Sequence, residues 1–248
     1  MQLYLLRHAQ SENNAKWEAN PHEVHRYSDI PLTDLGREQA RLTAEHLAQT
    51  NPTSSVNKFN GDNRKGFGIT HIYTSLMLRA TETAHIIADR LDMPVYGRTD
   101  LHEWGGVYET DERDEIRTGL PGSDRAFFTA HFPRLILPPD FVETGWWNNR
   151  PHESHTEVPA RARRVLKFIR KQHLHTDDRV LIVAHGGFIN MFLGHFLGIP
   201  PKQSLKNLEN NHWFVTNNTA LARIDMSLEF AGLIYLNRST HLPDELIT

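Results

Sequence analysis

An apolar run, Leu3-Tyr4-Leu5-Leu6, ends on Arg7-His8 at the start of the chain. The same order of residue types occurs twice more. Ile72-Tyr73-Thr74-Ser75 is followed by Leu76-Met77-Leu78-Arg79, and Val180–Ala184 is followed by His185-Gly186-Gly187. Parallel strands end at a common edge of their sheet, and ligands of α/β proteins bind at that edge. The three runs therefore predict three strand ends that direct arginine and histidine side chains to one site.

Four helical patterns alternate with apolar runs along the chain. Pro31-Leu32-Thr33-Asp34 is a start signal, and the spacing that follows predicts a helix from about Asp34 to Gln49. The apolar positions of the four patterns are Ala40, Ala44, Leu47 and Ala48; Ala80, Ala84, Ile87, Ala88 and Leu91; Val158, Ala162, Val165, Leu166 and Ile169; Ile189, Phe192, Leu193 and Phe196. This alternation predicts an α/β fold with a mostly parallel sheet and helices on both faces. Trp213–Ile224 and Phe230–Leu236 flank a short polar turn and predict an antiparallel hairpin at the sheet edge.

The length of 248 residues, 39% of them hydrophobic, is enough for one domain over residues 1–248. Residues 51–68 are rich in Asn, Ser and Gly without periodicity, which predicts a long mobile loop. Residues 110–155 mix phenylalanines and tryptophans with prolines and predict an inserted cap. Its aromatic side chains fit two interpretations, the wall of a substrate pocket or a small core of the cap itself.

Charge and composition narrow the range of partners. The net charge of −3 favours neither a nucleic acid nor an anionic membrane surface as a partner. Zero cysteines exclude disulfides and thiolate metal sites. The apolar start is too short for a signal peptide, and no run approaches the ~18 apolar residues of a membrane span. We expect a soluble, cytoplasmic protein with a small phosphorylated substrate, and the cap or the hairpin edge could mediate a homodimer.

The residues at the three strand ends suit a phosphoryl group. A guanidinium fork matches phosphate oxygens in a bidentate way, so Arg7 and Arg79 are candidate ligands. The same cations should lower the pKa of His8 and keep its imidazole neutral, which makes His8 a candidate nucleophile. His185 precedes Gly186-Gly187 and a helix start, where side chain and amides can stabilise the same oxygens.

Simpler interpretations exist for each residue. A single arginine after a strand is usually a surface residue, and a single histidine is usually a cap or a core group. The joint pattern favours a shared anion site over coincidence. The i, i+3 pairs His22/His25 and His152/His155 could bind zinc, but both lie in Pro-containing polar segments without a third ligand, so we expect no metal there.

At this point the sequence resembles the histidine phosphatase superfamily, in its phosphoglycerate mutase-like branch. The resemblance covers nearly the whole chain, with blocks in the family's order. The blocks are Leu5-Leu6-Arg7-His8-Ala9-Gln10-Ser11 with Asn14; Asp29–Gly36 through Gln39-Ala40; Thr74-Ser75-Leu76 through Arg79–Ala84; Leu101-His102-Glu103 with Gly106 and Glu109; Val183-Ala184-His185-Gly186; and Asn237–Leu242.

The resemblance implies a covalent mechanism without a metal or other cofactor. His8 would carry the phosphoryl group as a phosphohistidine, and Glu103 would protonate the leaving alkoxide and then act as a base towards water. A bound phosphate dianion favours the protonated form of a nearby carboxyl group, as this role requires. The residues implied to hold the phosphoryl oxygens are Arg7, Asn14, Arg79, His185 and Gly186.

Two departures from the family pattern bear on function. Ala9 stands where the family usually has glycine, and a positive φ there would be strained. Arg26 lies in a segment that differs from the family and could contact the substrate. The cap lacks the basic pairs expected of a mutase, which favours a phosphomonoester hydrolase. A phosphoglycerate mutase and a catalytically silent phosphate-binding module are the alternatives, and the sequence leaves the particular phosphomonoester open.

Overall fold

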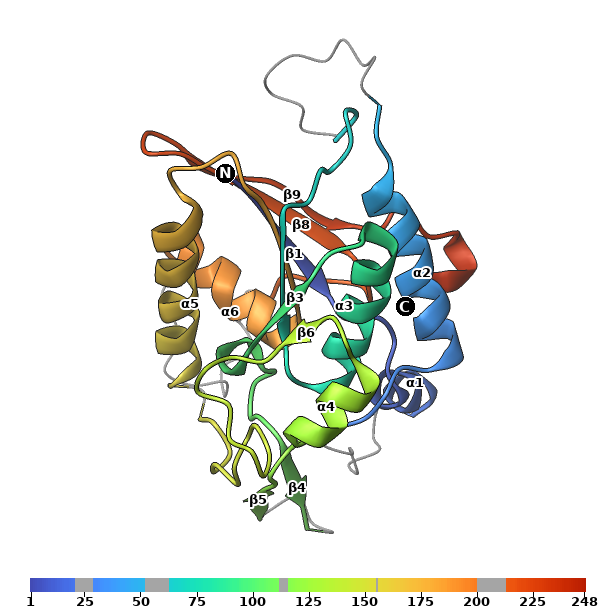
Figure 1. Cartoon of the computed structure of the whole chain (residues 1–248), viewed down its shortest axis with the longest axis vertical. Helices are drawn as coiled ribbons and strands as arrows, with labels where there is room; N and C mark the ends of the chain where they lie inside the picture. Colours follow the sequence, from blue (N-terminus) through green and yellow to red (C-terminus); the bar gives the residue numbers. More distant parts are fainter. Residues whose placement is uncertain (21–28, 52–62, 112–115, 155, 200–212) are drawn as a thin grey trace.

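The computed structural model describes residues 1–20, 29–51, 63–111, 116–154, 156–199 and 213–248. A seven-stranded sheet with the order β6-β3-β2-β7-β1-β8-β9 forms its centre (Figure 1). The strands are β1 (Gln2–Arg7), β2 (His71–Ser75), β3 (Val95–Arg98), β6 (Leu135–Ile136), β7 (Arg179–Ala184), β8 (Leu221–Met226) and β9 (Ala231–Arg238). The pairs from β6 to β1 are parallel, whereas β8 and β9 are antiparallel. The predicted α/β fold with an antiparallel hairpin at its edge is confirmed.

The register brings the ends of the three central strands to one level. Arg7 of β1 pairs with Ala184 of β7, and Thr74 of β2 pairs with Val183. Parallel strands in this register must deliver the residues that follow them to the same edge. His8 and His185 therefore leave the sheet side by side.

Helices cover both faces of the sheet (Figure 1). They are α1 (Glu12–Ala19), α2 (Asp34–Ala48), α3 (Leu78–Leu91), α4 (Arg125–His131), α5 (Val158–His173) and α6 (Gly186–Phe196), with short 3₁₀ turns at Thr99–Leu101 and Asp244–Leu246. Helices α5 and α6 share one apolar core with the sheet, while α2 and α3 share a second core on the other face. Helix α2 begins at Asp34 as predicted, and Thr33 is its N-cap, because the Thr33 hydroxyl accepts the Gly36 N–H across 3.0 Å. No described helix has the length and apolar character needed to cross a membrane.

Two strands of the main sheet, β3 and β6, were not predicted from the sequence. Strand β3 has only four residues and begins soon after α3 ends, so its pattern is too short to read alone. Strand β6 has two residues and comes from the segment predicted as the cap. Its pairing with β3 joins that segment to the edge of the main sheet.

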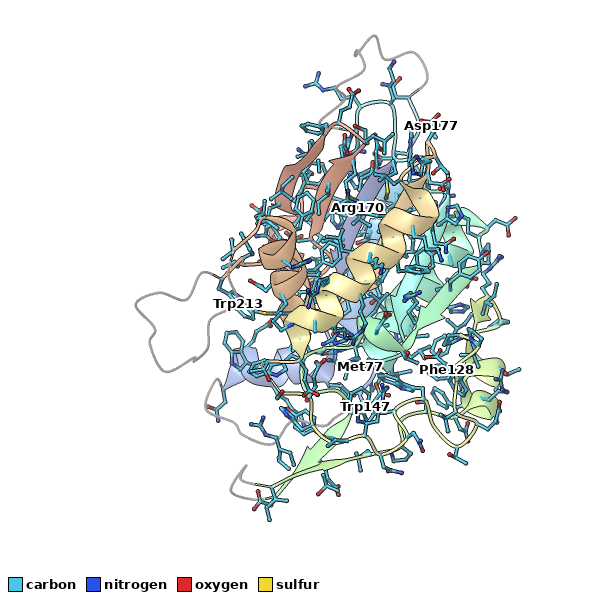
Figure 2. All side chains as sticks on the ribbon, turned by 90° about the vertical axis from the view of Figure 1, so that its left-hand side faces the viewer. Met77, Phe128, Trp147, Arg170, Asp177 and Trp213 are labelled. Carbon is cyan, nitrogen blue, oxygen red and sulfur yellow. The ribbon has the colours of Figure 1, made fainter. Side chains whose placement is uncertain are left out.

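The aromatic side chains of residues 110–155 are mostly buried. They pack with two residues that follow β2 in a cluster of Leu76, Met77, Val107, Phe128, Phe132, Phe141, Trp146 and Trp147. Figure 2 shows Met77, Phe128 and Trp147 gathered at one end of the molecule. The second small sheet, β4 (Tyr108–Thr110) with β5 (Arg117–Gly119), lies in the same part of the chain. These side chains form a small core, the second of the two interpretations of the sequence.

Most of the loop predicted at 51–68 lies outside the described residues. Its end, from Asn63 onward, packs against the sheet. Asn63 is buried and its Nδ2 donates to the Tyr4 hydroxyl across 2.7 Å, while Phe67 is 2% exposed in the core on the α2–α3 face. This part of the predicted loop is therefore held by side-chain contacts.

Candidate active site

Four predicted site residues meet at the carboxyl ends of β1, β2 and β7. The His8 N–H donates to the Ala184 carbonyl across 2.9 Å, and Nε of Arg79 donates to Nε2 of His8 across 3.1 Å. The rings of His8 and His185 lie edge to face with centroids 5.1 Å apart. Arg7 lies close to Gly186, the residue after His185, because a methyl group added to Gly186 would be 3.6 Å from Nε of Arg7. The structure thus brings together Arg7, His8, Arg79 and His185, as the strand ends predicted.

The hydrogen bonds of His8 fix its tautomer. Nδ1 lies 2.7 Å from the Ala9 carbonyl oxygen, and a carbonyl can only accept, so Nδ1 carries the proton. Nε2 faces the Arg79 guanidinium, which can only donate, so Nε2 presents its lone pair. This assignment follows from the partners of the two ring nitrogens. The nitrogen that faces the site is therefore the nucleophilic one.

The electrostatic environment also keeps His8 neutral. The side chain is 3% exposed, and burial, followed by the charges of Arg79 and Arg7, holds the pKa of His8 well below 6.5. The hydrogen bond to Ala9 acts in the opposite direction and does not reverse the effect. A neutral imidazole at neutral pH is the state that attack on phosphorus needs.

Three buried nitrogen atoms of the residues gathered at these strand ends have no hydrogen-bond partner. Among the described residues, Nε of Arg7, Nη1 of Arg79 and Nδ1 of His185 are buried and make no hydrogen bond. Unpaired buried polar groups are costly and rare in folded proteins. Burial lowers the pKa of both arginines, but the opposing charge of Glu103 favours their cationic forms. The arrangement matches an anion with several acceptor oxygens, such as a phosphoryl group.

His185 is held from behind by Ser75. The side chain of His185 is fully buried, and its Nε2 lies 2.9 Å from Oγ of Ser75 at the end of β2. Burial, and after it the positive charge of Arg79, keep the pKa of His185 well below 6.5. Its other nitrogen, Nδ1, is one of the unpartnered groups described above.

Glu103 lies at the N-terminus of α6. Its carboxylate accepts the N–H groups of Gly187 and Phe188, each across 3.0 Å, and that of Trp104 across 2.8 Å. From the sequence, these helix amides were predicted to stabilise the phosphoryl oxygens. In the structure the side chain of Glu103 accepts hydrogen bonds from the Gly187 and Phe188 amides, so these amides are already paired.

The remaining predicted site residues contribute less direct contacts. Oδ1 of Asn14 accepts the Ser11 N–H across 3.1 Å and the Ser11 hydroxyl across 2.9 Å, so this oxygen caps α1. Arg26 lies outside the described residues. Ala9 has no positive φ, and its methyl packs with Leu32 and Ala40, so alanine fits in place of the family's usual glycine.

Several site residues were missed by the sequence analysis. Nδ2 of the fully buried Asn218 donates to the His8 carbonyl across 2.8 Å. The Thr83 hydroxyl accepts the Ala9 N–H across 3.1 Å, and the Thr216 carbonyl accepts from Nη1 of Arg7 across 2.6 Å. Asp29 accepts the Leu78 N–H at the start of α3 across 2.6 Å, and burial raises its pKa to about 6. Asn218 and Thr216 lie in the stretch predicted as the first arm of the hairpin, Trp213–Ile224, but β8 begins only at Leu221 and both residues precede it.

Of the four histidines weighed as zinc ligands, the structure describes only His152. His22, His25 and His155 lie outside the described part of the chain. His152 contacts the cap instead, with Nε2 2.8 Å from Nη1 of Arg117 and its ring edge to face with Tyr108.

With this geometry in place, comparison with known proteins identifies the class. The model of the histidine phosphatase superfamily (branch 1) matches residues 3–57 and 60–227. The match covers most of the chain, and the chain belongs to this superfamily.

Its relatives include both phosphatases and mutases. A protein of Hydrogenobacter thermophilus, named provisionally as phosphoserine phosphatase 2, is 29% identical over 96% of each chain. A protein of Photorhabdus laumondii, named provisionally as the phosphoglycerate mutase GpmB, is 30% identical over 81% of this chain and 76% of its own. The fold is shared with a mutant phosphoserine phosphatase from Entamoeba histolytica in complex with phosphoserine, with a TM-score of 0.58 and 19% identity over 98% and 99% of the two chains.

Proposed function

We propose that the protein hydrolyses phosphomonoesters through a phosphohistidine on Nε2 of His8. The observation that carries this proposal is the orientation of His8. Its lone pair faces the site, among the unpartnered donors of Arg7, Arg79 and His185. A neutral nucleophile among preorganised donors is the arrangement that phosphoryl transfer requires.

In the first step, Nε2 of His8 attacks phosphorus and the bond from phosphorus to the ester oxygen breaks. The arginine forks and His185 stabilise the charge on the equatorial oxygens as the group transfers. A Ser75 hydroxyl that donates to Nε2 of His185 leaves the proton of that ring on Nδ1, which then donates to the phosphoryl group. Protonated Glu103 gives its proton to the leaving alkoxide and becomes a carboxylate.

In the second step, water attacks the phosphohistidine. Glu103 takes a proton from that water, the bond from phosphorus to nitrogen breaks, and neutral His8 is regenerated with inorganic phosphate. The acid form of Glu103 is then ready for the next ester. The hydrogen bonds from the α6 amides would keep the Glu103 carboxyl group in one orientation through both steps.

The substrate class we propose is a small phosphomonoester. The phosphoserine complex of the Entamoeba relative supports this class. Most aromatic side chains of residues 110–155 pack in the small core of that segment. Polar side chains of the same segment, such as His152 and Arg117, contact each other near Tyr108. A cytoplasmic location, a homodimer and independence of divalent metal for catalysis stay predictions. Multi-angle light scattering on the purified chain tests the dimer.

Phosphoglycerate mutase activity is the second candidate, because of the relative named as a mutase. It predicts transfer between the hydroxyl groups of a phosphoglycerate and dependence on a bisphosphorylated primer. Release of inorganic phosphate from phosphoglycerate without isomerisation excludes it.

The decisive experiment traps the intermediate. A short incubation with ³²P-labelled or aryl phosphate substrate is quenched in alkali, and the modified residue is located by mass spectrometry. We expect label on His8 and none in His8→Ala. A panel of phosphomonoesters, assayed with and without chelator, then ranks substrates. Label on another residue, or full turnover by His8→Ala, refutes the mechanism, and no phosphate release from any ester favours a silent binding module.

A further inference from the structure

A second cluster of polar side chains lies at the opposite end of the sheet. His71 begins β2, His173 ends α5, and Asp178 directly precedes β7. Their potential ligand atoms all lie within 4.8 Å of one another. The Nδ1 atom of His173 is 2.8 Å from Oδ2 of Asp178, and Nδ1 of His71 is 3.8 Å from Oδ1. We propose that these three residues form a binding site for a divalent transition metal such as Zn²⁺.

The spacing of the ligand atoms suits such an ion. Bonds of about 2.0–2.1 Å in a tetrahedral arrangement put neighbouring ligand atoms roughly 3.4 Å apart. The two distances to the Asp178 carboxylate, 2.8 Å and 3.8 Å, lie on either side of that value. The ligand nitrogens of the two histidines also lie within 4.8 Å of each other, and the side chain of His71 is 33% exposed.

The donor types select the class of metal. Two imidazoles and one carboxylate suit Zn²⁺, Co²⁺, Ni²⁺ or Cu²⁺. Mg²⁺ and Ca²⁺ take oxygen ligands, so two nitrogen donors among three disfavour them. An ionised carboxylate is the form that binds a metal.

The surrounding residues orient the ligands. The hydroxyl of Tyr73, two residues along β2 from His71, lies 3.1 Å from Nε2 of His173. Metal-bound histidines usually donate their other ring N–H to a fixed oxygen, and Tyr73 supplies one. The Thr70 hydroxyl, 2.9 Å from Nδ1 of His71, competes with the metal for that nitrogen. His71 and Asp178 are partly exposed, so an ion can reach them from solvent.

The site is separate from the catalytic one. His71 and Ser75 are the two ends of β2, about 13 Å apart along an extended strand. Figure 2 shows Asp177, the neighbour of Asp178, at one end of the molecule and Met77, which lies beside Arg79, towards the other. A metal at this site would join the end of α5 to the starts of β2 and β7, so its effect is on stability and not on turnover.

Isothermal titration with Zn²⁺ tests the proposal, together with thermal unfolding at fixed Zn²⁺ concentrations. We expect the wild-type chain to bind one equivalent that Asp178→Asn and His71→Ala weaken by at least roughly tenfold. Tyr73→Phe should weaken it by about 10- to 100-fold, the usual loss for a residue that orients a ligand. His175→Ala is the matched control, since it removes an exposed histidine close in the chain and should change nothing.

The melting temperature of the wild type should rise with Zn²⁺, whereas that of Asp178→Asn should not. The readout is the shift caused by the metal, so a variant that is less stable without metal still gives an answer. Zn²⁺ bound at the catalytic histidines is followed separately through inhibition of phosphate release, which Asp178→Asn should leave unchanged. Equal Zn²⁺ affinity in the wild type and Asp178→Asn, or no Zn²⁺-induced shift in the wild type, overturns the proposal.

Discussion

Nε of Arg79 donates to Nε2 of His8 across 3.1 Å, on the lone pair that would attack phosphorus. The arginine therefore orients the ring of His8, the proposed nucleophile, and also covers its lone pair. A phosphoryl group that enters must draw the guanidinium away from the ring, which its oxygens can do because charge-assisted bonds to phosphate are stronger than a bond to a neutral nitrogen. Substrate binding and exposure of the nucleophile are thus one event.

Arg79→Ala is expected to lower kcat/KM by roughly 10²–10³-fold, the loss typical of one preorganised stabiliser of developing charge. Because the charge of Arg79 helps to lower the pKa of His8, the acid limb of the pH–rate profile should also move to higher pH. Steady-state assays from acid to neutral pH measure both effects. Arg90→Ala, an exposed arginine on the same helix, is the control and should match the wild type. An unchanged acid limb would contradict the electrostatic role.

Arg161 is expected to position Glu103 from behind. Its guanidinium is 2% exposed, forms a bidentate ion pair with Glu153, and donates to the carbonyls of Asp100 and His102 across 3.1 Å and 2.8 Å. The residue after His102 is Glu103, so Arg161 fixes the segment that carries the proposed acid. A misplacement of about 1 Å can cost roughly 10²-fold in rate.

Arg161→Lys should therefore slow the hydrolysis of alkyl phosphates by roughly 10²-fold but affect p-nitrophenyl phosphate little, since a nitrophenolate leaves without a proton. The ratio of kcat values for the two substrates distinguishes this role from a general loss of fold, which would slow both alike. Arg163→Lys, at an exposed position of α5, is the matched control. Equal losses on the two substrates would rule out the positioning role.

The sequence predicted the site residues that come from parallel strands, and it missed one that precedes an antiparallel strand. Arg7, His8, Arg79 and His185 each lie at the end of a parallel strand, directly after it, or in the first turn of the next helix, so the strand-end rule located them. Asn218 precedes β8, which runs antiparallel to β1, and its start lies beside the end of β1. Asn218 reaches His8 only because β8 pairs with β1. Strand pairing is a tertiary interaction, and no local sequence pattern encodes it.

The same limit applies to Glu103 and to β3. The motif around Glu103 indicated a catalytic acid, but its bonds to the Gly187 and Phe188 amides depend on the approach of two distant segments. Strand β3 contains Gly97, whose close contact with Leu76 leaves no room for a side chain, and its strand conformation comes from pairing with β2. Long periodic helices such as α5 were predictable because their pattern is local.

The stability of the fold should fall as the pH drops below 6.5. Burial holds the pKa values of His8, His102 and His185 well below 6.5 in the folded state. The unfolded chain then binds more protons than the folded one, so each such histidine costs up to about 1.4 kcal/mol per pH unit of acidification. Above pH 6.5 these histidines therefore leave the free energy of unfolding at its full value, and below pH 6.5 they lower it.

Asp29 acts in the opposite sense. Its pKa rises from 3.8 to about 6 on folding, mainly through burial, so its contribution is present below pH 3.8 and lost as the pH rises through 6. Asp29→Asn removes this opposing effect and keeps an oxygen for the Leu78 N–H. We expect a steeper fall of the free energy of unfolding between pH 6 and 4 than in the wild type. Urea unfolding at a series of pH values measures the slope, and parallel slopes for the two proteins would show that Asp29 titrates normally.

Asn218→Ala is expected to reduce both stability and turnover, because Asn218 ties the C-terminal part of the chain to the nucleophile. Its Nδ2 donates to the His8 carbonyl across 2.8 Å, and its Oδ1 accepts the Thr248 hydroxyl across 3.1 Å, all in a fully buried position. Truncation leaves the His8 carbonyl without this donor, which costs about 1–3 kcal/mol for a buried group. Asn217→Ala is the control, since Asn217 donates to Asn237 through its backbone N–H, which the substitution keeps. Urea unfolding and phosphate release together decide the matter: a loss of stability with normal turnover would mean that Asn218 supports the fold without positioning His8.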